Sequence, residues 1–275
     1  MSPDLIYDVG LHNGTDTAYY LHKGFRVVAI DANPVLVAAA QDRFRAEIAN
    51  GRLRVLNIGI AEQQGTLSFW VNEANDLQSS FSEERAKRYG PCHEIPVRCV
   101  PFSSVLAEHG VPYFMKVDIE GYDCFCVSSL NPSDLPKHIS VEADGDCDVV
   151  AELQKLGYSK FKLVNQLTFT DSMPITQDEL GRRFLRKLSV KVPWVKSVLG
   201  TPAIASRLAR TDFDTFREKS AYTFGPGSSG PFGDESFGTW RPAGEISARL
   251  QEIQRKIVAG RVPSGSYWCD VHATY

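Results

Sequence analysis

The sequence predicts an α/β protein built on a mostly parallel sheet with helices on both faces. Through the first half of the 275-residue chain, short apolar runs alternate with helical patterns, and short glycine-bearing turns connect them. Unusual polar residues follow directly after the apolar runs. Strands that alternate with helices pair in parallel through right-handed crossovers, and their ligands bind beyond the carboxyl ends of the strands. We therefore expect the functional residues just after the strands.

Six strands and four helices are predicted in this part of the chain. The first strand ends in glycine, and the second stops at Asp31-Ala-Asn-Pro34, whose proline suits the first turn of a helix. The predicted strands cover Leu5–Gly10, Arg26–Ile30, Leu53–Ile58, Gly65–Val71, Tyr113–Asp118 and Ile139–Glu142. The predicted helices cover Gly14–Leu21, Pro34–Phe44, Asp123–Leu130 and Cys147–Leu156.

The composition changes after about Gln177. Residues 182–210 carry eight arginines and lysines and no acidic residue, and residues 220–241 are rich in glycine, serine, proline and aromatic side chains. We predict a core over 1–180 and, over 181–275, an elaboration packed on that core. A basic tract is by default a solvated helix face. The apolar residues interleaved in 182–210 leave open a peripheral contact with a membrane or an anionic acceptor.

The bulk composition argues against several classes of protein. The formal net charge of −3 gives no global attraction to nucleic acid. No apolar stretch approaches the roughly 20 residues that a membrane-spanning helix needs. The amino terminus lacks the basic and apolar segments of a signal peptide, so we expect a cytoplasmic location. None of the six cysteines has C-x-x-C spacing, and we expect buried, reduced thiols.

A glycine-containing turn follows the first predicted strand. The segment Asp8-Val-Gly10-Leu-His-Asn-Gly14-Thr15 has the spacing D-x-G-x-x-x-G, which differs from the G-x-G-x-x-G of dinucleotide-binding proteins. Glycine lets the backbone approach a ligand, and the following helix offers unpaired N–H groups. Asp31 ends the next strand, where its carboxylate can accept hydrogen bonds from two ribose hydroxyls. Since Asn33 is available to cap the following helix, these features favour a nucleoside-containing cofactor.

Carboxylates gather after the last two predicted strands. The segment Met115-Lys-Val-Asp118-Ile-Glu120-Gly121-Tyr-Asp123 places three of them at one strand end. Burying such charges without a partner is costly. We therefore interpret Asp118 and Glu120 as functional, and Asp123 as a rim residue that faces water. Glu142 ends the next strand and is expected to face the same cleft.

These segments resemble the FkbM family of S-adenosylmethionine-dependent methyltransferases. The resemblance covers roughly Asp4 to Gly157, and Lys116-Val-Asp118-Ile-Glu120-Gly121 is its most specific part. The other matching segments are Asp8-Val-Gly10 with Gly14, Ala29-Ile-Asp31-Ala-Asn-Pro34, Ser79-Ser80 and Ile139-Ser-Val-Glu142. In the carboxyl half, Ser229-Gly-Pro-Phe-Gly-Asp234 with Trp240 looks like an element of some family members.

The resemblance implies a Rossmann-like class I methyltransferase fold with a seven-stranded sheet. It also implies methyl transfer from S-adenosylmethionine to a hydroxyl of a sugar, glycan or natural product. Asp8, Gly10 and Gly14 would line the methionine end of the cofactor, Asp31 would hold the ribose, and Asp118 would lie near the methyl group. The full set of expected cofactor-binding residues is Asp8, Gly10, Asn13, Gly14, Thr15, Asp31, Ala32, Asn33, Ser80 and Asp118. The expected catalytic residues are Asp118, Glu120 and Glu142.

The residues alone leave other interpretations open. The four carboxylates Asp118, Glu120, Glu142 and Asp144 would also suit Mg²⁺, although we assign no metal ligand. An NAD-dependent oxidoreductase uses a similar sheet, and a catalytically silent nucleoside-binding or interaction module would keep the fold without turnover. We expect a small-molecule, sugar or lipid-linked glycan acceptor, no nucleic acid, and a homodimer by default.

Overall fold

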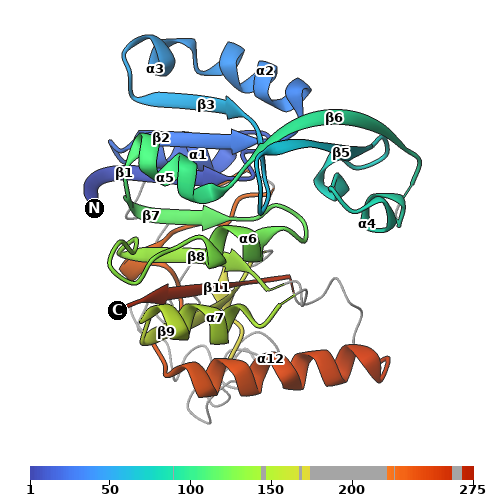
Figure 1. The fold of residues 1–275 in the computed structure, drawn as a ribbon. Coiled ribbons are helices and arrows are strands. Elements are labelled where there is room, and N and C mark those ends of the chain that lie inside the picture. Colours follow the sequence, from blue (N-terminus) through green and yellow to red (C-terminus); the bar gives the residue numbers. More distant parts are fainter. Residues whose placement is uncertain (89, 144–146, 167–168, 174–221, 226, 262–267) are drawn as a thin grey trace, which may run out of the picture.

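The computed structural model describes residues 1–88, 90–143, 147–166, 169–173, 222–225, 227–261 and 268–275 (Figure 1). Its central sheet contains β1 (Ser2–Val9), β2 (Arg26–Asp31), β3 (Leu53–Asn57), β7 (Pro112–Val117), β8 (His138–Glu142), β9 (Lys160–Asn165), β10 (Thr170–Asp171) and β11 (Cys269–Thr274). The order of these strands is β10-β9-β11-β8-β7-β1-β2-β3.

The predicted fold class is confirmed by the pairing of these strands. β1 lies between β2 and β7, and β3 and β8 extend the sheet on either side, all in parallel. β11 is antiparallel to both β8 and β9. Among the described residues the sheet has one strand more than predicted, the two-residue β10 at its edge. β11 lies inside the sheet, so residues 269–274 complete the core that we predicted within 1–180.

Helices cover both faces of the sheet, because successive side chains of a strand point to opposite faces. On β1, Tyr7 and Val9 enter one hydrophobic core, whereas Ile6 enters another. The helices that contribute to the first core are α5 (Phe102–His109), α6 (Asp123–Ser128), α7 (Val149–Leu156) and α12 (Ala243–Val258). The second core contains residues of α1 (Thr15–His22) and α2 (Pro34–Arg43), and the short α3 (Arg45–Ala49) follows α2.

A second, three-stranded sheet projects from the side at which the parallel strands end (Figure 1). It consists of β4 (Gly59–Ile60), β5 (Gly65–Asn72) and β6 (Cys92–Val100), in the order β4-β6-β5. Between β5 and β6 lie the 3₁₀ turn η1 (Asp76–Gln78) and α4 (Glu83–Lys87). The strand predicted at 65–71 therefore forms, but it pairs antiparallel with β6 outside the main sheet.

The described part of the carboxyl half packs against the core. Phe232 stacks on Phe114 of β7 with ring centroids 4.4 Å apart, and the short η2 (Gly233–Glu235) follows it. The basic tract 182–210 lies outside the described residues, and the division of the chain at residue 180 stays a prediction. Within the described ranges, no helix is both long and apolar enough to cross a membrane.

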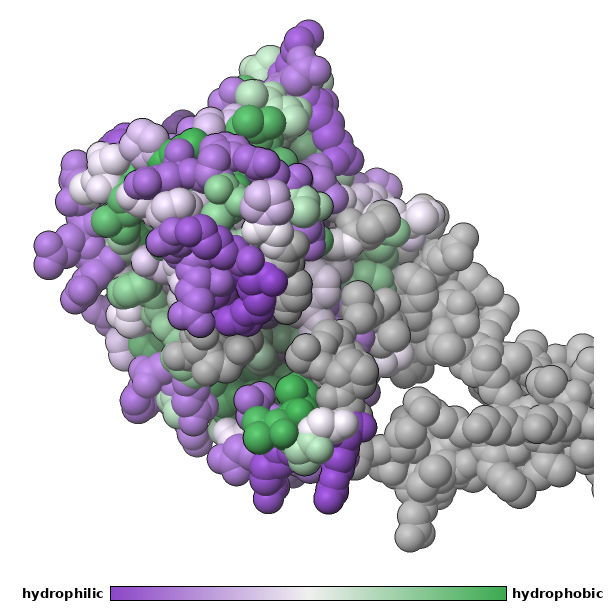
Figure 2. Space-filling model, turned by 90° about the vertical axis from the view of Figure 1, so that its right-hand side faces the viewer, coloured by the Kyte–Doolittle hydropathy of each residue, from purple (hydrophilic) through white to green (hydrophobic). Residues whose placement is uncertain are grey.

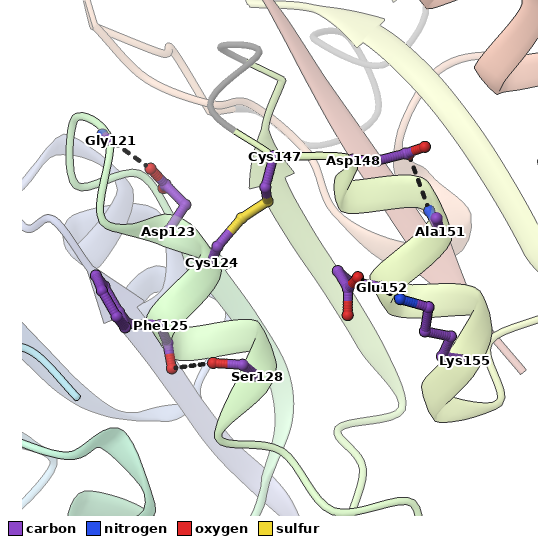
Figure 3. Close-up of a disulfide and its surroundings, with 10 residues drawn as sticks. All are labelled: Gly121, Asp123, Cys124, Phe125, Ser128, Cys147, Asp148, Ala151, Glu152 and Lys155. Atoms are coloured by element: carbon purple, nitrogen blue, oxygen red, sulfur yellow. Dashed lines mark hydrogen bonds and ion pairs between the residues drawn. A yellow bond between two sulfur atoms is a disulfide. The ribbon is translucent and has the colours of Figure 1, made fainter.

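The expectation of reduced thiols is wrong for two cysteines. Cys124 at the start of α6 and Cys147 just before α7 form a disulfide, with their Cα atoms 6.6 Å apart (Figure 3). These helices follow the neighbouring parallel strands β7 and β8, so their amino ends come close in space although 23 residues separate the cysteines. Sequence spacing alone does not carry that information. The other four cysteines, Cys92, Cys99, Cys126 and Cys269, are free.

The disulfide makes a testable contribution to stability. Closing a loop of this length restricts the unfolded chain, so Cys124→Ser with Cys147→Ser should lower the free energy of unfolding by about 3 kcal/mol. Urea unfolding of the oxidised proteins measures the difference, and Cys92→Ser, which removes a free thiol, is the control. Dithiothreitol should destabilise the wild type and leave the double variant unchanged. Titration of six reactive thiols in the unfolded, unreduced wild type would contradict the disulfide.

Candidate functional site

A cavity opens at the carboxyl ends of β1, β2, β3 and β7, where the sequence predicts the ligand site. It encloses about 860 Å³, including its open mouth. Figure 2 looks onto this side of the molecule, where hydrophilic residues border smaller hydrophobic areas. Eight of the predicted site residues line the cavity: Gly10, Asn13, Thr15, Asp31, Ala32, Asn33, Asp118 and Glu120. Asp8, Gly14, Ser80 and Glu142 do not line it.

The glycine turn forms the floor of the cavity. Gly10 has φ +89°, and its N–H donates to the carbonyl of Ile30 at 2.9 Å. A Cβ atom on Gly10 would lie 1.8 Å from the carbonyl oxygen of Asp118, so only glycine lets these two loops meet. Gly14 begins α1 with φ +72° and packs against the ring of Phe44. Gly14 therefore turns the chain into α1, between Asn13 and Thr15, which line the cavity.

Asp31 is fixed in the wall by backbone donors. One carboxylate oxygen accepts the N–H of His12 and the other accepts the N–H of Asn33, both at 2.8 Å. Asn33 caps α2 by accepting the N–H of Val35 at 3.0 Å, as expected, so Asp31 is not needed as the cap. Each oxygen of Asp31 keeps a further lone pair, which can accept a ligand hydroxyl.

A buried lysine holds the carboxylates beneath the cavity together. The Lys116 ammonium donates to the carbonyl of Gly10 at 2.9 Å and lies 3.5–3.7 Å from carboxylate oxygens of Asp8, Asp16 and Asp118. Burial acts to lower the pKa of Lys116, but the surrounding carboxylates, Asp118 foremost, raise it above its ordinary value. Asp8 is fully buried and also accepts the hydroxyl of Thr17 at 2.6 Å. Asp8 therefore lies beneath the cavity without lining it, and its predicted contact with the cofactor stays a prediction.

The predicted catalytic carboxylates come together. One oxygen each of Asp118, Glu120 and Glu142 lies within 4.8 Å of the other two. Glu120 has φ +51° and pairs with Arg85 at 3.3 Å. Burial raises the pKa of Glu120 to about 7, with the Asp118 charge adding to the shift and Arg85 opposing it. Burial also raises the pKa of Glu142 well above its ordinary value, and the neighbouring carboxylates add to that shift.

The loop that carries Glu120 is held from two sides. Asp123, which we expected to face water, is 3% exposed and accepts the N–H groups of Ile119 and Gly121 at 3.1 and 3.2 Å. Figure 3 shows the second of these bonds beside the disulfide. Ser80 is fully buried, and its hydroxyl donates to the carbonyl of Glu120 at 2.8 Å. Ser80 therefore supports the acidic loop, and its predicted contact with the cofactor stays a prediction.

Several residues of the cavity were missed by sequence reasoning. His12 lines it and pairs with Asp76 of η1 at 3.1 Å, although its position in the turn gave no sign of this. Gly227 and Trp268 reach the cavity from the carboxyl half. Part of the cavity wall is apolar and could contact an aromatic ring of a ligand. This part is formed by Leu36, Ile58, Ile60, Phe69, Leu77 and Phe81. The second sheet supplies Ile60 and Phe69, and the segment between β5 and β6 supplies Leu77 and Phe81. The place of this sheet beside the cavity was not predicted.

The carboxyl half is anchored to α1 through Asp16. Asp16 is 4% exposed, and its two oxygens accept the N–H of Ser229 at 3.1 and 3.0 Å. The hydroxyl of Ser228 donates to the same carboxylate. This contact gives the Ser229–Asp234 segment, whose role was open, a structural place against the wall of the cavity.

The charge of the cavity limits which ligands it suits. Its lining includes five carboxylates, from Asp16, Asp31, Asp76, Asp118 and Glu120, against one lysine and one histidine. A pyrophosphate would meet these carboxylates unfavourably, whereas a cationic ligand would be attracted. The geometry thus suits a positively charged nucleoside with an apolar base and a ribose on Asp31.

The family model of the methyltransferase FkbM domain matches residues 8–160, more than half of the chain. No curated protein sequence matches significantly. Among solved structures, the chain is similar to methyltransferase FkbM from Methylobacillus flagellatus KT at 16% identity and a TM-score of 0.39, over 57% of this chain and 38% of that chain.

The chain is also similar to precorrin-6y C5,15-methyltransferase from Geobacter metallireducens GS-15. The identity is 13% and the TM-score 0.34, over 60% of this chain and 70% of that chain. TM-scores this low add nothing to the argument from the family match. The chain spans well under half the length of the Methylobacillus flagellatus protein.

The close contact at Gly10 is testable by substitution. Gly10→Ala should lower the free energy of unfolding by at least about 2 kcal/mol, because the new methyl group overlaps the Asp118 carbonyl and φ is positive. Gly65→Ala is the matched control, since a Cβ there meets nothing within 4 Å. Chemical unfolding of both variants measures the difference. Equal stability of the two variants would show that the Asp118 loop does not rest on Gly10.

Proposed function

Since the chain belongs to the methyltransferase FkbM domain family, we propose that it methylates a hydroxyl oxygen of a sugar, glycan or natural-product acceptor. Family membership makes S-adenosylmethionine the methyl donor. The observation that carries the proposal is the pairing of a ribose-accepting carboxylate, Asp31, with the carboxylates Asp118 and Glu120 in one cavity. The Asp31 carboxylate can accept the ribose hydroxyls of a nucleoside, and the Asp118 and Glu120 carboxylates can accept the proton of an acceptor hydroxyl.

The cavity fits this cofactor in its donor set and charge. Asp31 would accept the ribose hydroxyls, and the apolar wall formed by residues such as Phe69 and Phe81 would contact the adenine. When bound, the cofactor supplies a methyl group on a positively charged sulfur. The five lining carboxylates favour that charge.

Asp118 and Glu120 are the residues of the cavity that can act on an acceptor. When the acceptor hydroxyl is methylated it must lose its proton, and a carboxylate oxygen of Asp118 or Glu120 would accept that proton. Holding the acceptor oxygen in line with the carbon–sulfur bond supplies much of the acceleration. Glu142 does not line the cavity, so we propose that it acts through these two neighbours.

The remaining expectations about partners stay proposals. They are a small-molecule, sugar or lipid-linked glycan acceptor, no nucleic acid, a membrane contact through 182–210, a homodimer and a cytoplasmic location.

The two rival functions would require different properties of the cavity. An NAD-dependent oxidoreductase would have to accommodate a pyrophosphate against these carboxylates, and a silent module would bind the nucleoside without turnover.

Titration calorimetry with S-adenosylhomocysteine tests the cofactor part of the proposal. Asp31→Ala should weaken binding about tenfold or more, because charged hydrogen bonds to the ribose are lost. Asp42→Ala is the matched control, since Asp42 is exposed on α2 and pairs only with Arg45 among the described residues. NAD should not bind. Cofactor-stripped wild type that binds NAD and not S-adenosylhomocysteine would overturn the proposal. Binding without methylation of any hydroxyl acceptor would favour the silent module.

A further inference from the structure

The carboxylates of Asp118, Glu120 and Glu142 have the spacing of ligands around one metal ion. Their nearest oxygens lie within 4.8 Å of one another. Two oxygens on opposite sides of a Ca²⁺ ion are about 4.8 Å apart, and about 4.2 Å apart around Mg²⁺, from the usual ion–oxygen distances. Only two ligands can be opposite one another, and three oxygens spread evenly around one ion lie about 4.2 Å apart for Ca²⁺ and about 3.6 Å apart for Mg²⁺. The three carboxylates, within 4.8 Å of one another, can therefore contact a single cation after their side chains adjust.

Glu142 provides a separate indication that a ligand belongs here. Its side chain is only 7% exposed, and among the described residues its Oε2 atom has no hydrogen-bond partner. Buried carboxylate oxygens are nearly always paired, because an unpaired one loses its hydration without compensation. The Glu142 carboxylate is directed toward Asp118 and Glu120, so the missing partner would lie among these three groups.

The cations around the cluster do not balance its charge. Arg85 pairs with Glu120 at 3.3 Å. Lys116 reaches Asp118 at 3.5 Å but divides its charge between that residue, Asp8 and Asp16. Among the described residues, no lysine, arginine or histidine forms an ion pair with Glu142. The cluster therefore has an excess of negative charge, which a bound divalent cation would offset.

The loops that carry these carboxylates are braced against movement. Asp123 and Ser80 bond the backbone of the Asp118–Gly121 loop, and the adjacent disulfide ties α6 to the segment that follows β8 (Figure 3). Such supporting contacts hold metal ligands in position. They agree with a site that is formed before any ligand binds.

We propose that Asp118, Glu120 and Glu142 bind a hard divalent cation of the Mg²⁺ class at the edge of the cofactor cavity. All donors are carboxylate oxygens, and no histidine or cysteine joins them within the described part of the chain, which favours Mg²⁺, Mn²⁺ or Ca²⁺ over zinc. Three protein ligands leave coordination positions for water or for a ligand oxygen. These positions face the cavity, because Asp118 and Glu120 line it.

The cation would have a role in the proposed reaction, and this role, unlike the binding itself, rests on the proposed function. An acceptor hydroxyl bound to the cation is held beside the cavity and loses its proton more readily. The proton would pass to water or to a carboxylate of the cluster, and the oxygen would bond to the methyl carbon as the bond from that carbon to sulfur breaks.

Electron paramagnetic resonance of Mn²⁺ titrated into the purified full chain tests the site. The wild type should bind one Mn²⁺, with displacement by excess Mg²⁺ or Ca²⁺. Glu142→Gln, which keeps the shape of the side chain, should weaken binding about tenfold or more. Glu73→Gln is the control, because Glu73 is half exposed and pairs with His93 in the second sheet. It should bind Mn²⁺ as the wild type does.

Thermal unfolding of the same proteins separates a binding defect from a folding defect. Without divalent cations, Glu142→Gln should melt no lower than the wild type, because it removes a repelling charge. Added Mg²⁺ should raise the melting temperature of the wild type and not that of Glu142→Gln. Absence of Mn²⁺ binding at concentrations of about 1 mM, or equal binding by both proteins, would overturn the cation site.

A titration with S-adenosylhomocysteine on the same preparation keeps the two proposals apart. Cofactor binding without Mn²⁺ binding would overturn the cation site alone. Mn²⁺ binding that is lost in Glu142→Gln, in a protein that does not bind S-adenosylhomocysteine, would support the cation site and overturn the proposed function.

Discussion

The buried ammonium of Lys116 is the interaction on which the site depends. Asp8, Asp16 and Asp118 come from three different segments, and each would be costly to bury alone. Lys116 lies within 3.7 Å of all three and also binds the carbonyl of Gly10. Removing one partner of such a buried network leaves the other charges uncompensated. Lys116 therefore holds three parts of the chain in position relative to one another: the turn after β1, helix α1 and the loop that carries Asp118.

The same network connects the cavity to the carboxyl half of the chain. Asp16 faces Lys116 on one side and accepts hydrogen bonds from Ser228 and Ser229 on the other. Phe232, three residues further on, is buried against Phe114 of β7. The polar contacts thus fix Ser228 and Ser229 on α1, and the aromatic contact fixes Phe232 on β7. The electrostatics of the cavity and the packing of the carboxyl half are consequently not independent features.

Residues that follow a strand directly could be predicted from the sequence, and residues brought in from elsewhere could not. Gly10, Asp31 and Asp118 stand at strand ends, and parallel strands deliver their carboxyl ends to one edge of a sheet. Phe69 and Phe81 enter the cavity because the second sheet and its connecting segment lie beside it, which no local pattern records. β11 was also missed. Its Cys-Asp-Val-His-Ala-Thr sequence alternates apolar and polar residues, as a half-exposed strand does, although the polar Asp270, His272 and Thr274 are buried as well. Nothing in that pattern indicates a strand inside the sheet.

The interior position of β11 has a consequence for how the molecule assembles. Within the described residues, β9 joins the parallel strands only through β11, which is also the last strand in the chain. On the ribosome, β8 therefore presents an unpaired edge until residues 269–274 have emerged. Exposed strand edges invite pairing with other chains. The nascent protein thus passes through a stage at which β8 is exposed to such pairing, whereas β1, β2, β3 and β7 can pair much earlier.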